Sequence, residues 1–186
     1  MTAMRRSATN RVRIIGGAWR SRIVKFPSSA GLRPTPDRVR ETLFNWLGQR
    51  LDGLRCLDLF AGSGALGFES LSRGAARVVM VERDREAARQ LRESARALDA
   101  TGLEIVEGDA LAYLEAARER FDVAFLDPPY ASDLAGRALG RLPRVLEPGA
   151  RVYVESAAKL ELPVPWRALR EDRAGAVRYA LYGLEQ

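Results

Sequence analysis

The tetrapeptide Asp127-Pro128-Pro129-Tyr130 combines a carboxylate, a stiff backbone and an aromatic ring at the end of an apolar run. Open α/β sheets bind their ligands at the carboxyl ends of the strands, so this position suits a reaction centre. The carboxylate and the Pro128 carbonyl can accept hydrogen bonds from an exocyclic amine, while the ring stacks on the base that carries it. These contacts would localise the nitrogen lone pair, and they predict an amine nucleophile. A plain turn after a buried strand is the alternative.

A glycine-rich loop, Gly62-x-Gly64-x-x-Gly67, lies within the segment LDLFAGSGALGFES at 57–70. Twenty residues after its first glycine comes Glu82, at the end of the next apolar run, where an acid can hold ribose hydroxyls. This pattern by itself fits NAD as well as other adenosine cofactors.

Asp58 discriminates between these cofactors. It lies in an otherwise apolar strand, where an unpaired buried carboxylate costs several kcal/mol. A pyrophosphate gains nothing from a neighbouring acid, whereas the ammonium group of S-adenosylmethionine would balance its charge. The same molecule offers a ribose to Glu82 and a carboxylate to backbone N–H groups at the helix start. We therefore favour S-adenosylmethionine, with capping of the glycine loop as the alternative role of Asp58.

The composition excludes several other chemistries. The chain has no histidine, which removes histidine-based triads and the commonest zinc sites. Its one cysteine, Cys56, excludes a disulfide framework and fits a reducing compartment, so we expect a cytoplasmic protein without a metal. No run of eighteen apolar residues is present, and we expect no membrane span.

Asp58, Glu82 and Asp127 can meet at one edge of a sheet only if strands and helices alternate along the chain. From residue 54 onward apolar runs alternate with helical patterns, and two strand-like segments flank Ala174-Gly175 at the end. The alternation predicts a doubly wound, mostly parallel α/β sheet with an antiparallel hairpin at one edge. The expected strands are 54–60, 77–82, 103–107, 121–127, 150–155, 166–173 and 176–183, and the expected helices are 65–73, 84–99, 110–119 and 132–146.

The N-terminal part predicts a small extension. A β-hairpin is expected over 11–26, with a tight turn at Gly16-Gly17. Thr35 before Pro36 is typical of a helix start. In the helix that follows, apolar side chains at helical spacing give one face that should dock on the main domain: Val39, Leu43, Trp46, Leu47 and Leu51.

Positive charge is concentrated in the first forty residues. They hold ten basic side chains and one acidic side chain, whereas the rest of the chain holds twenty and twenty-three, which gives +6 overall. This asymmetry predicts a polyanionic partner. We therefore divide the chain into a basic extension at 1–50, for binding such a partner, and a catalytic domain at 51–186; the family resemblance given below implies that the partner is RNA. The residues expected to contact nucleic acid are Arg13, Trp19, Arg20, Arg22, Lys25, Arg33 and Arg38.

The motifs DLFAGSGALG, VERD and DPPY together resemble the amino-methyltransferase branch of the class I S-adenosylmethionine-dependent methyltransferases. The segments RIIGGAWRSR, RPTPDRVRETLFNWL and ESLSRGA narrow the resemblance to the bacterial RsmD-type family. This resemblance implies methylation of the N2 amine of a guanine in 16S ribosomal RNA, on an assembled or assembling small subunit. It also implies a seven-stranded Rossmann-like sheet with the last strand inserted antiparallel. We expect a monomer.

The resemblance further assigns a role to each candidate residue. Asp58 and the glycine loop would surround the methionine part of the cofactor. Glu82 would hold its ribose, and Asp109 with Ala110 would face its adenine. Asp109 directly before a helix is also an ordinary N-cap. The expected cofactor site comprises Asp58, Phe60, Ala61, Gly62, Ser63, Gly64, Glu82, Arg83, Asp109 and Ala110, and the expected catalytic residues are Asp127, Pro128, Pro129 and Tyr130.

Three other readings stay open at this point. The same amine chemistry would serve adenine N6 in DNA or a glutamine amide. An NAD-dependent oxidoreductase would use the glycine loop differently, although Asp58 would be an awkward neighbour for its pyrophosphate. A non-catalytic RNA-binding protein would keep the fold without the reaction.

Overall fold

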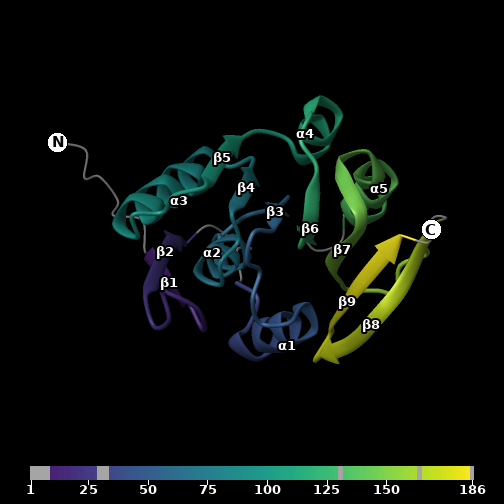
Figure 1. Ribbon diagram of the computed structural model, residues 1–186, viewed down its shortest axis with the longest axis horizontal. Helices are drawn as coiled ribbons and strands as arrows, with labels where there is room; N and C mark the ends of the chain where they lie inside the picture. Colours follow the sequence, from purple (N-terminus) through teal and green to yellow (C-terminus); the bar gives the residue numbers. More distant parts are fainter. Residues whose placement is uncertain (1–8, 29–33, 130–131, 163–164, 185–186) are drawn as a thin grey trace.

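A mixed β-sheet forms the centre of the molecule in the computed structural model, which describes residues 9–28, 34–129, 132–162 and 165–184. Its seven strands are β3 (Arg55–Asp58), β4 (Arg77–Glu82), β5 (Leu103–Glu107), β6 (Phe121–Leu126), β7 (Leu146–Ser156), β8 (Trp166–Ala174) and β9 (Val177–Leu184). They are arranged in the order β5-β4-β3-β6-β7-β9-β8 (Figure 1). Strands β3 to β7 pair in parallel, whereas β9 is antiparallel to both β7 and β8. The predicted sheet, with its last strand inserted antiparallel, is confirmed.

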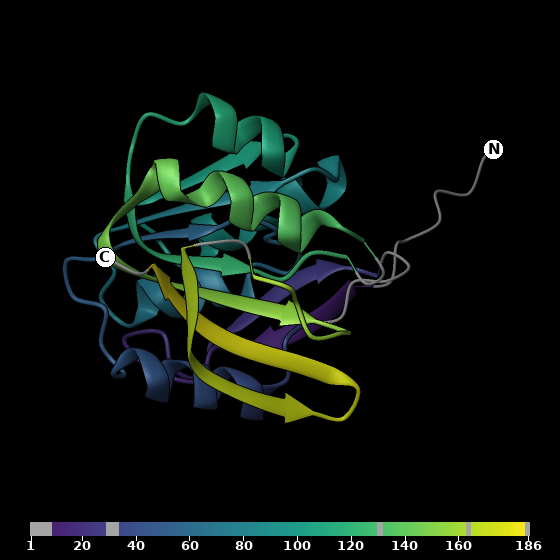
Figure 2. The same cartoon turned by 90° about the vertical axis from the view of Figure 1, so that its right-hand side faces the viewer.

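Helices cover both faces of this sheet. They are α1 (Asp37–Leu47), α2 (Ala65–Ser72), α3 (Arg85–Ala97), α4 (Ala110–Ala116) and α5 (Leu134–Arg141). One buried apolar cluster joins α1, α2 and α3 to one face, and a second joins α4 and α5 to the other. Figure 2 shows α5 in green above the sheet and α1 in blue below it. The expected helix over 132–146 divides into α5 and a 3₁₀ turn, Leu142–Val145, which contains Pro143.

The N-terminal hairpin is present, but its predicted tight turn is wrong. Strand β1 (Thr9–Arg13) pairs antiparallel with β2 (Ile23–Pro27), and Arg13 faces Ile23, so a loop of residues 14–22 connects them. The loop is long because its backbone binds α2: Ala18 N donates to the Ser72 carbonyl at 2.7 Å. Gly17 has φ +76° there, and a side chain would overlap that same carbonyl. Its conformation serves docking onto α2 rather than a two-residue turn.

Helix α1 begins one residue later than the helix-start signal suggested. Pro36 is the N-cap residue, and the preceding Thr35 makes no side-chain cap. The apolar face is as predicted, because Val39, Leu43 and Leu47 are buried. These side chains belong to the same buried cluster as residues of β1, β2, β3, α2 and α3. The hairpin and α1 are therefore packed on the sheet rather than standing apart from it.

Candidate active site

The carboxyl ends of β3 and β6 meet at the point where the strand order reverses direction. From β3 the chain proceeds outward through β4 and β5, and then returns to place β6 on the other side of β3. Open α/β sheets bind ligands in the crevice at this point. Asp58 is the last residue of β3 and lies opposite Phe125 in β6, and Asp127 follows β6 directly. The topology therefore brings the two predicted acids to the same edge of the sheet, at the ends of neighbouring strands.

Asp58 is a buried carboxylate whose environment fits an ammonium ligand. The residue is 2% exposed, and Oδ2 accepts a hydrogen bond from the Gly67 N–H at 3.0 Å. The pKa of Asp58 is raised to about 7, because burial and the charge of Glu82, which both raise it, outweigh the Gly67 hydrogen bond, which lowers it. A cation bound beside this carboxylate would favour its charged form. Gly67 packs against Met80, and a Cβ there would overlap the Met80 side chain.

The loop after β3 is fixed by Glu82, the last residue of β4. Its Oε2 accepts from Gly62 N at 2.7 Å, and its Oε1 accepts from Asp84 N at 2.7 Å. Each carboxylate oxygen has a second lone pair, so the partly exposed side chain can still accept hydrogen bonds from two ribose hydroxyls. Gly64 has φ +75°, and a Cβ there would lie 2.5 Å from Leu91. Glycine is thus required there both by the left-handed backbone and by close packing against Leu91 of α3 and Phe68 of α2.

The other expected cofactor residues lie along the same carboxyl edge of the sheet as Asp58 and Glu82. Asp109 caps α4, because its Oδ1 accepts from Ala112 N at 2.9 Å, and its side chain is exposed. Ser63 is buried, and its Oγ accepts from Ala65 N at 3.3 Å. Of the remaining residues, Ala61 and Ala110 are buried, Phe60 is half-buried and Arg83 is exposed. Asp109 thus has the N-cap role that the sequence analysis gave as the alternative to adenine contact. That Asp109 also contacts adenine stays a prediction.

Asp127 lies next to a second acid that the sequence analysis did not single out. The Thr35 hydroxyl donates to Glu155 Oε1 at 2.8 Å and lies 3.5 Å from Asp127 Oδ2. Tyr153 Oη donates to the same Glu155 oxygen at 2.9 Å. Burial, followed by the negative charges of Glu155 and Asp58, raises the pKa of Asp127 well above its usual range. Burial also raises the pKa of Glu155, while its two hydroxyl donors lower it.

The signal for these residues was partly present in the sequence. Glu155 ends the apolar run Val152–Val154, just as Asp58 and Asp127 end or follow theirs. Thr35 carried only the local signal of a helix start, which gives no indication of a partner on β7. Among the prolines of the tetrapeptide, Pro128 is half-buried and Pro129 is exposed, with its carbonyl accepting from Ser132 Oγ at 2.8 Å. Tyr130 lies outside the described residues.

The residues expected to contact nucleic acid lie mostly on the hairpin and its loop. Arg13 forms an ion pair with Asp37 at 3.0 Å, and Arg22 donates to the Ala97 carbonyl at 2.8 Å. Trp19 is partly buried and packs against the apolar cluster below the sheet. Arg20, Lys25 and Arg38 are exposed, and Arg33 lies outside the described residues.

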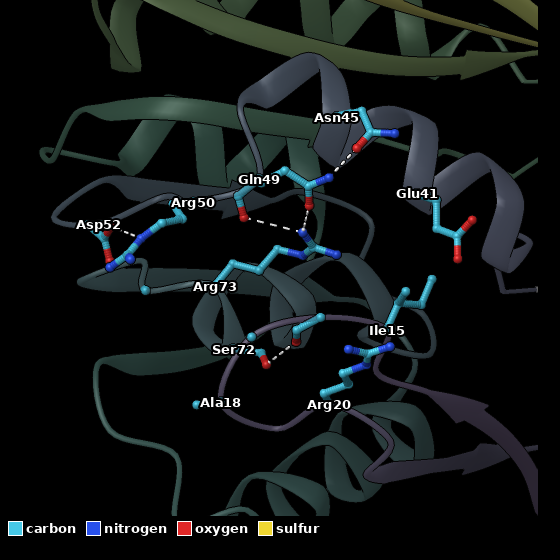
Figure 3. Close-up of a pocket in the computed structure, with 13 residues that line it drawn as sticks. Ile15, Ala18, Arg20, Glu41, Asn45, Gln49, Arg50, Asp52, Ser72 and Arg73 are labelled. Atoms are coloured by element: carbon cyan, nitrogen blue, oxygen red, sulfur yellow. Dashed lines mark hydrogen bonds and ion pairs between the residues drawn. The ribbon is translucent and has the colours of Figure 1, made fainter.

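A surface pocket lies at the opposite, amino edge of the sheet, between the loop 14–22 and the C-terminal ends of α1 and α2 (Figure 3). Arg20 lines it. Arg73 in this pocket donates to the backbone and side-chain oxygens of Gln49 at 3.2 and 2.5 Å, and Arg50 pairs with Asp52. The acids of the candidate active site are not among its lining residues.

Within the described ranges, no three His, Cys, Asp or Glu side chains form a group that could hold a metal ion. No helix in this part of the chain is both long and apolar enough to cross a membrane.

The chain has close relatives over nearly its whole length. A family model described as "Conserved hypothetical protein 95" matches residues 12–183. Ribosomal RNA small subunit methyltransferase D of Escherichia coli strain K12 is 44% identical over 184 residues, which cover 96% of this chain and 93% of that protein. The protein of the same name from Haemophilus influenzae is 43% identical, covering 95% of each.

Solved structures agree with these relatives. The structure described as a putative methyltransferase yhhF from Escherichia coli superimposes with a TM-score of 0.85 at 43% identity and covers 95% of this chain and 99% of that one. A putative methylase from Haemophilus influenzae gives a TM-score of 0.79 at 40% identity, covering 93% of this chain and 98% of that one. The chain thus belongs to the family of ribosomal RNA small subunit methyltransferase D, which confirms the resemblance carried by its motifs.

Proposed function

We propose that this protein transfers a methyl group from S-adenosylmethionine to the N2 amine of a guanine in the RNA of the small ribosomal subunit. The observation that carries the proposal is the pair Asp58 and Asp127 at the strand-order reversal, in a chain whose relatives are named as small-subunit ribosomal RNA methyltransferases. Asp58 would face the cofactor and Asp127 the target amine.

The residues present fit the cofactor. Asp58, buried and with its pKa raised to about 7, would balance the ammonium group. Glu82 would hold the ribose hydroxyls with lone pairs that its two backbone donors leave free. Asp109 and Ala110 would face the adenine, with Phe60, Ala61, Ser63, Gly64 and Arg83 completing the walls. S-adenosylmethionine, when bound there, supplies an electrophilic methyl group on its sulfonium centre.

The chain itself would activate the nucleophile. Asp127 would accept a hydrogen bond from the guanine N2 amine, and the Pro128 carbonyl would accept the second N–H. Two acceptors held by consecutive prolines would turn the amine lone pair out of conjugation and toward the donor. Tyr130 would stack on the base and hold its plane. Because an amine that is engaged in a base pair cannot donate both N–H groups to these acceptors, the guanine must be unpaired or flipped out of its helix.

The basic extension would hold the RNA. The carboxyl edge carries acids, which repel phosphates, whereas residues 1–40 carry all of the excess positive charge. We assign phosphate contacts to Arg13, Arg20, Arg22, Lys25, Arg33 and Arg38 and base stacking to Trp19. In this division residues 1–50 recognise RNA and residues 51–186 perform the transfer, although both share one apolar cluster.

The test offers several nucleic acids to one enzyme preparation. The protein is incubated with isotope-labelled S-adenosylmethionine and either under-methylated small subunits, naked 16S RNA or DNA, and the nucleosides are identified by mass spectrometry. We expect N2-methylguanosine, formed on subunits or RNA. Methyladenine in DNA, or no transfer to any of the three while the cofactor binds, would contradict the proposal.

Asp127→Ala provides the matched control for this assay. Without the acceptor, the amine keeps its delocalised lone pair, and we expect transfer to fall at least about 100-fold. Calorimetric affinity for S-adenosylmethionine should stay within about threefold of the wild type, since Asp58 and Glu82 are untouched. Equal loss of binding and transfer would show that Asp127 belongs to the cofactor site instead.

A further inference from the structure

Glu155 is a buried acid that the assigned cofactor and amine contacts leave unused. The residue lies near the end of β7 and is 7% exposed. No Lys or Arg side chain within the described residues forms an ion pair with it, and its hydrogen-bond donors are the neutral hydroxyls of Thr35 and Tyr153. A buried carboxylate without a cation lowers stability by several kcal/mol. A purely structural role would be met as well by glutamine.

Thr35 connects this acid to Asp127. Its hydroxyl has one proton, which the 2.8 Å distance commits to Glu155 rather than to Asp127 at 3.5 Å. The Arg40 side chain holds Thr35 in place, because Nε donates to the Thr35 carbonyl at 3.1 Å. Arg40 is itself buried and bound to Glu69. The threonine is thus fixed between the two carboxyl groups, and its oxygen can accept a hydrogen bond from Asp127 once that acid carries a proton.

Asp127 and Glu155 differ in how readily each takes up a proton. Glu155 receives two hydroxyl donors on one oxygen, which favours its charged form, whereas the described contact of Asp127 is the longer one to the shared hydroxyl. The charged or titratable groups that face Asp127 are Glu155 of β7 and Asp58 of β3. Around Glu155 they are Tyr153, with Tyr179 of β9 behind it, and Asp127 itself. The charge of Glu155 therefore makes Asp127 the more basic partner.

We propose that Glu155, bridged by Thr35 and supported by Tyr153, is a positioning residue that orients Asp127 and makes it the acceptor of the proton that the target amine releases. This inference rests on the proposed function. As the new N–C bond forms and the methyl–sulfur bond breaks, one amine N–H bond breaks and its proton passes to Asp127 Oδ. The sulfur keeps the electron pair of the broken bond, and Asp127 releases the proton to water afterwards.

The first test reads Asp127 directly in the free protein. The protein is labelled with ¹³C at aspartate carboxyl groups, Asp127 is assigned by Asp127→Asn, and its signal is followed against pH. In Glu155→Gln the neighbouring charge is gone, and we expect the Asp127 midpoint to fall by about one pH unit. Glu147→Gln, the same change at the other end of β7, should leave it unmoved. An unchanged midpoint in Glu155→Gln would overturn the inference.

A second pair of variants tests the bridge if Glu155→Gln folds poorly. Thr35→Val removes the hydroxyl at nearly constant volume, whereas Thr35→Ser keeps it. We expect Thr35→Val to lower kcat about tenfold with unchanged cofactor affinity and to move the acidic limb of the pH–rate profile, and Thr35→Ser to restore both. Equal kcat and equal profiles in Thr35→Val and Thr35→Ser would refute the bridge.

The two tests separate this inference from the substrate assignment. The carboxyl titration needs neither RNA nor cofactor, so a wrong substrate leaves its result unchanged. An unmoved Asp127 signal refutes the coupling even where guanine is methylated.

Discussion

The carboxyl group of Asp58 is set in an apolar strand, where its charged form is disfavoured. Burial raises its pKa to about 7, whereas an aspartate in an unfolded chain titrates near 4. Between these pH values the native state keeps a proton that the unfolded chain has lost. The stability of the ligand-free protein therefore falls as pH rises through this window and changes no further from this source above it.

Asp58→Asn removes that charge while its amide oxygen can still accept from Gly67. We expect the variant to exceed the wild type in free energy of unfolding by an amount that grows between pH 4 and 7. The gain should reach on the order of 4 kcal/mol above that range. Urea denaturation of both proteins at a series of pH values measures it. A constant difference across the series would show that Asp58 titrates as an ordinary aspartate.

The same substitution should weaken cofactor binding. Without the carboxylate the ammonium group of S-adenosylmethionine loses its counter-charge, and we expect the Kd to rise about tenfold or more at pH 8. Asp133→Asn is the control, since that side chain is 76% exposed at the start of α5. Isothermal calorimetry compares the three proteins. A variant that is more stable and yet binds as tightly as the wild type would remove Asp58 from the cofactor site.

At the scale of elements, the buried Glu69 joins α1 and the hairpin loop to its own helix, α2. Its two carboxylate oxygens accept from Gly16 N at 2.7 Å, Ile15 N at 2.9 Å, Arg73 Nε at 2.9 Å and Arg40 Nη1 at 3.2 Å. Removing one member of such a network leaves buried charges and donors without a partner. The segments that carry the candidate RNA contacts and Thr35 therefore depend on this one side chain for their position.

Glu69→Ala should accordingly lower the free energy of unfolding by about 3–5 kcal/mol. Glu86→Ala, which breaks an exposed, solvent-screened ion pair with Arg89 in α3, should change it far less. Chemical denaturation followed by circular dichroism compares them. Similar losses in the two variants would mean that the network contributes no more than a surface pair.

Local patterns predicted the elements well because each strand and helix carries its own periodicity. Asp58, Glu82 and Asp127 could be placed on the same grounds, since an acid at the end of an apolar strand is a local signal. The conformation of the loop 14–22 and the role of Thr35 could not be predicted from local signals. Thr35 meets Asp127 and Glu155 across 92 and 120 residues of sequence, and the pattern around it is that of an ordinary helix start. Contacts between residues so far apart in the sequence produce no periodic pattern from which they could be predicted.

At the scale of the whole molecule, acidic and basic side chains gather in two different places. The carboxyl edge gathers Asp58, Glu82, Asp127 and Glu155, while the excess positive charge lies in the N-terminal segment. In Figure 1 the hairpin of β1 and β2 lies beside α2 and α3, far from α5. RNA affinity should thus come from the hairpin side, whereas basic residues on α5 should contribute little.

Two triple variants with the same loss of charge test this separation. Arg20, Arg22 and Lys25 on the hairpin are changed to alanine in one. In the other, Arg137 and Arg141 of α5 and Arg144 of the 3₁₀ turn after it are changed to alanine. Because each phosphate contact contributes about 0.7–0.9 to the slope of log affinity against log salt, we expect the first variant to reduce that slope by about 2–3. The second variant should reduce it by less than about one. Filter binding of 16S RNA from 50 to 200 mM salt measures both slopes, with thermal denaturation confirming that each variant is folded. Equal slopes in the two variants would mean that net charge alone attracts the RNA and that the hairpin is not its binding surface.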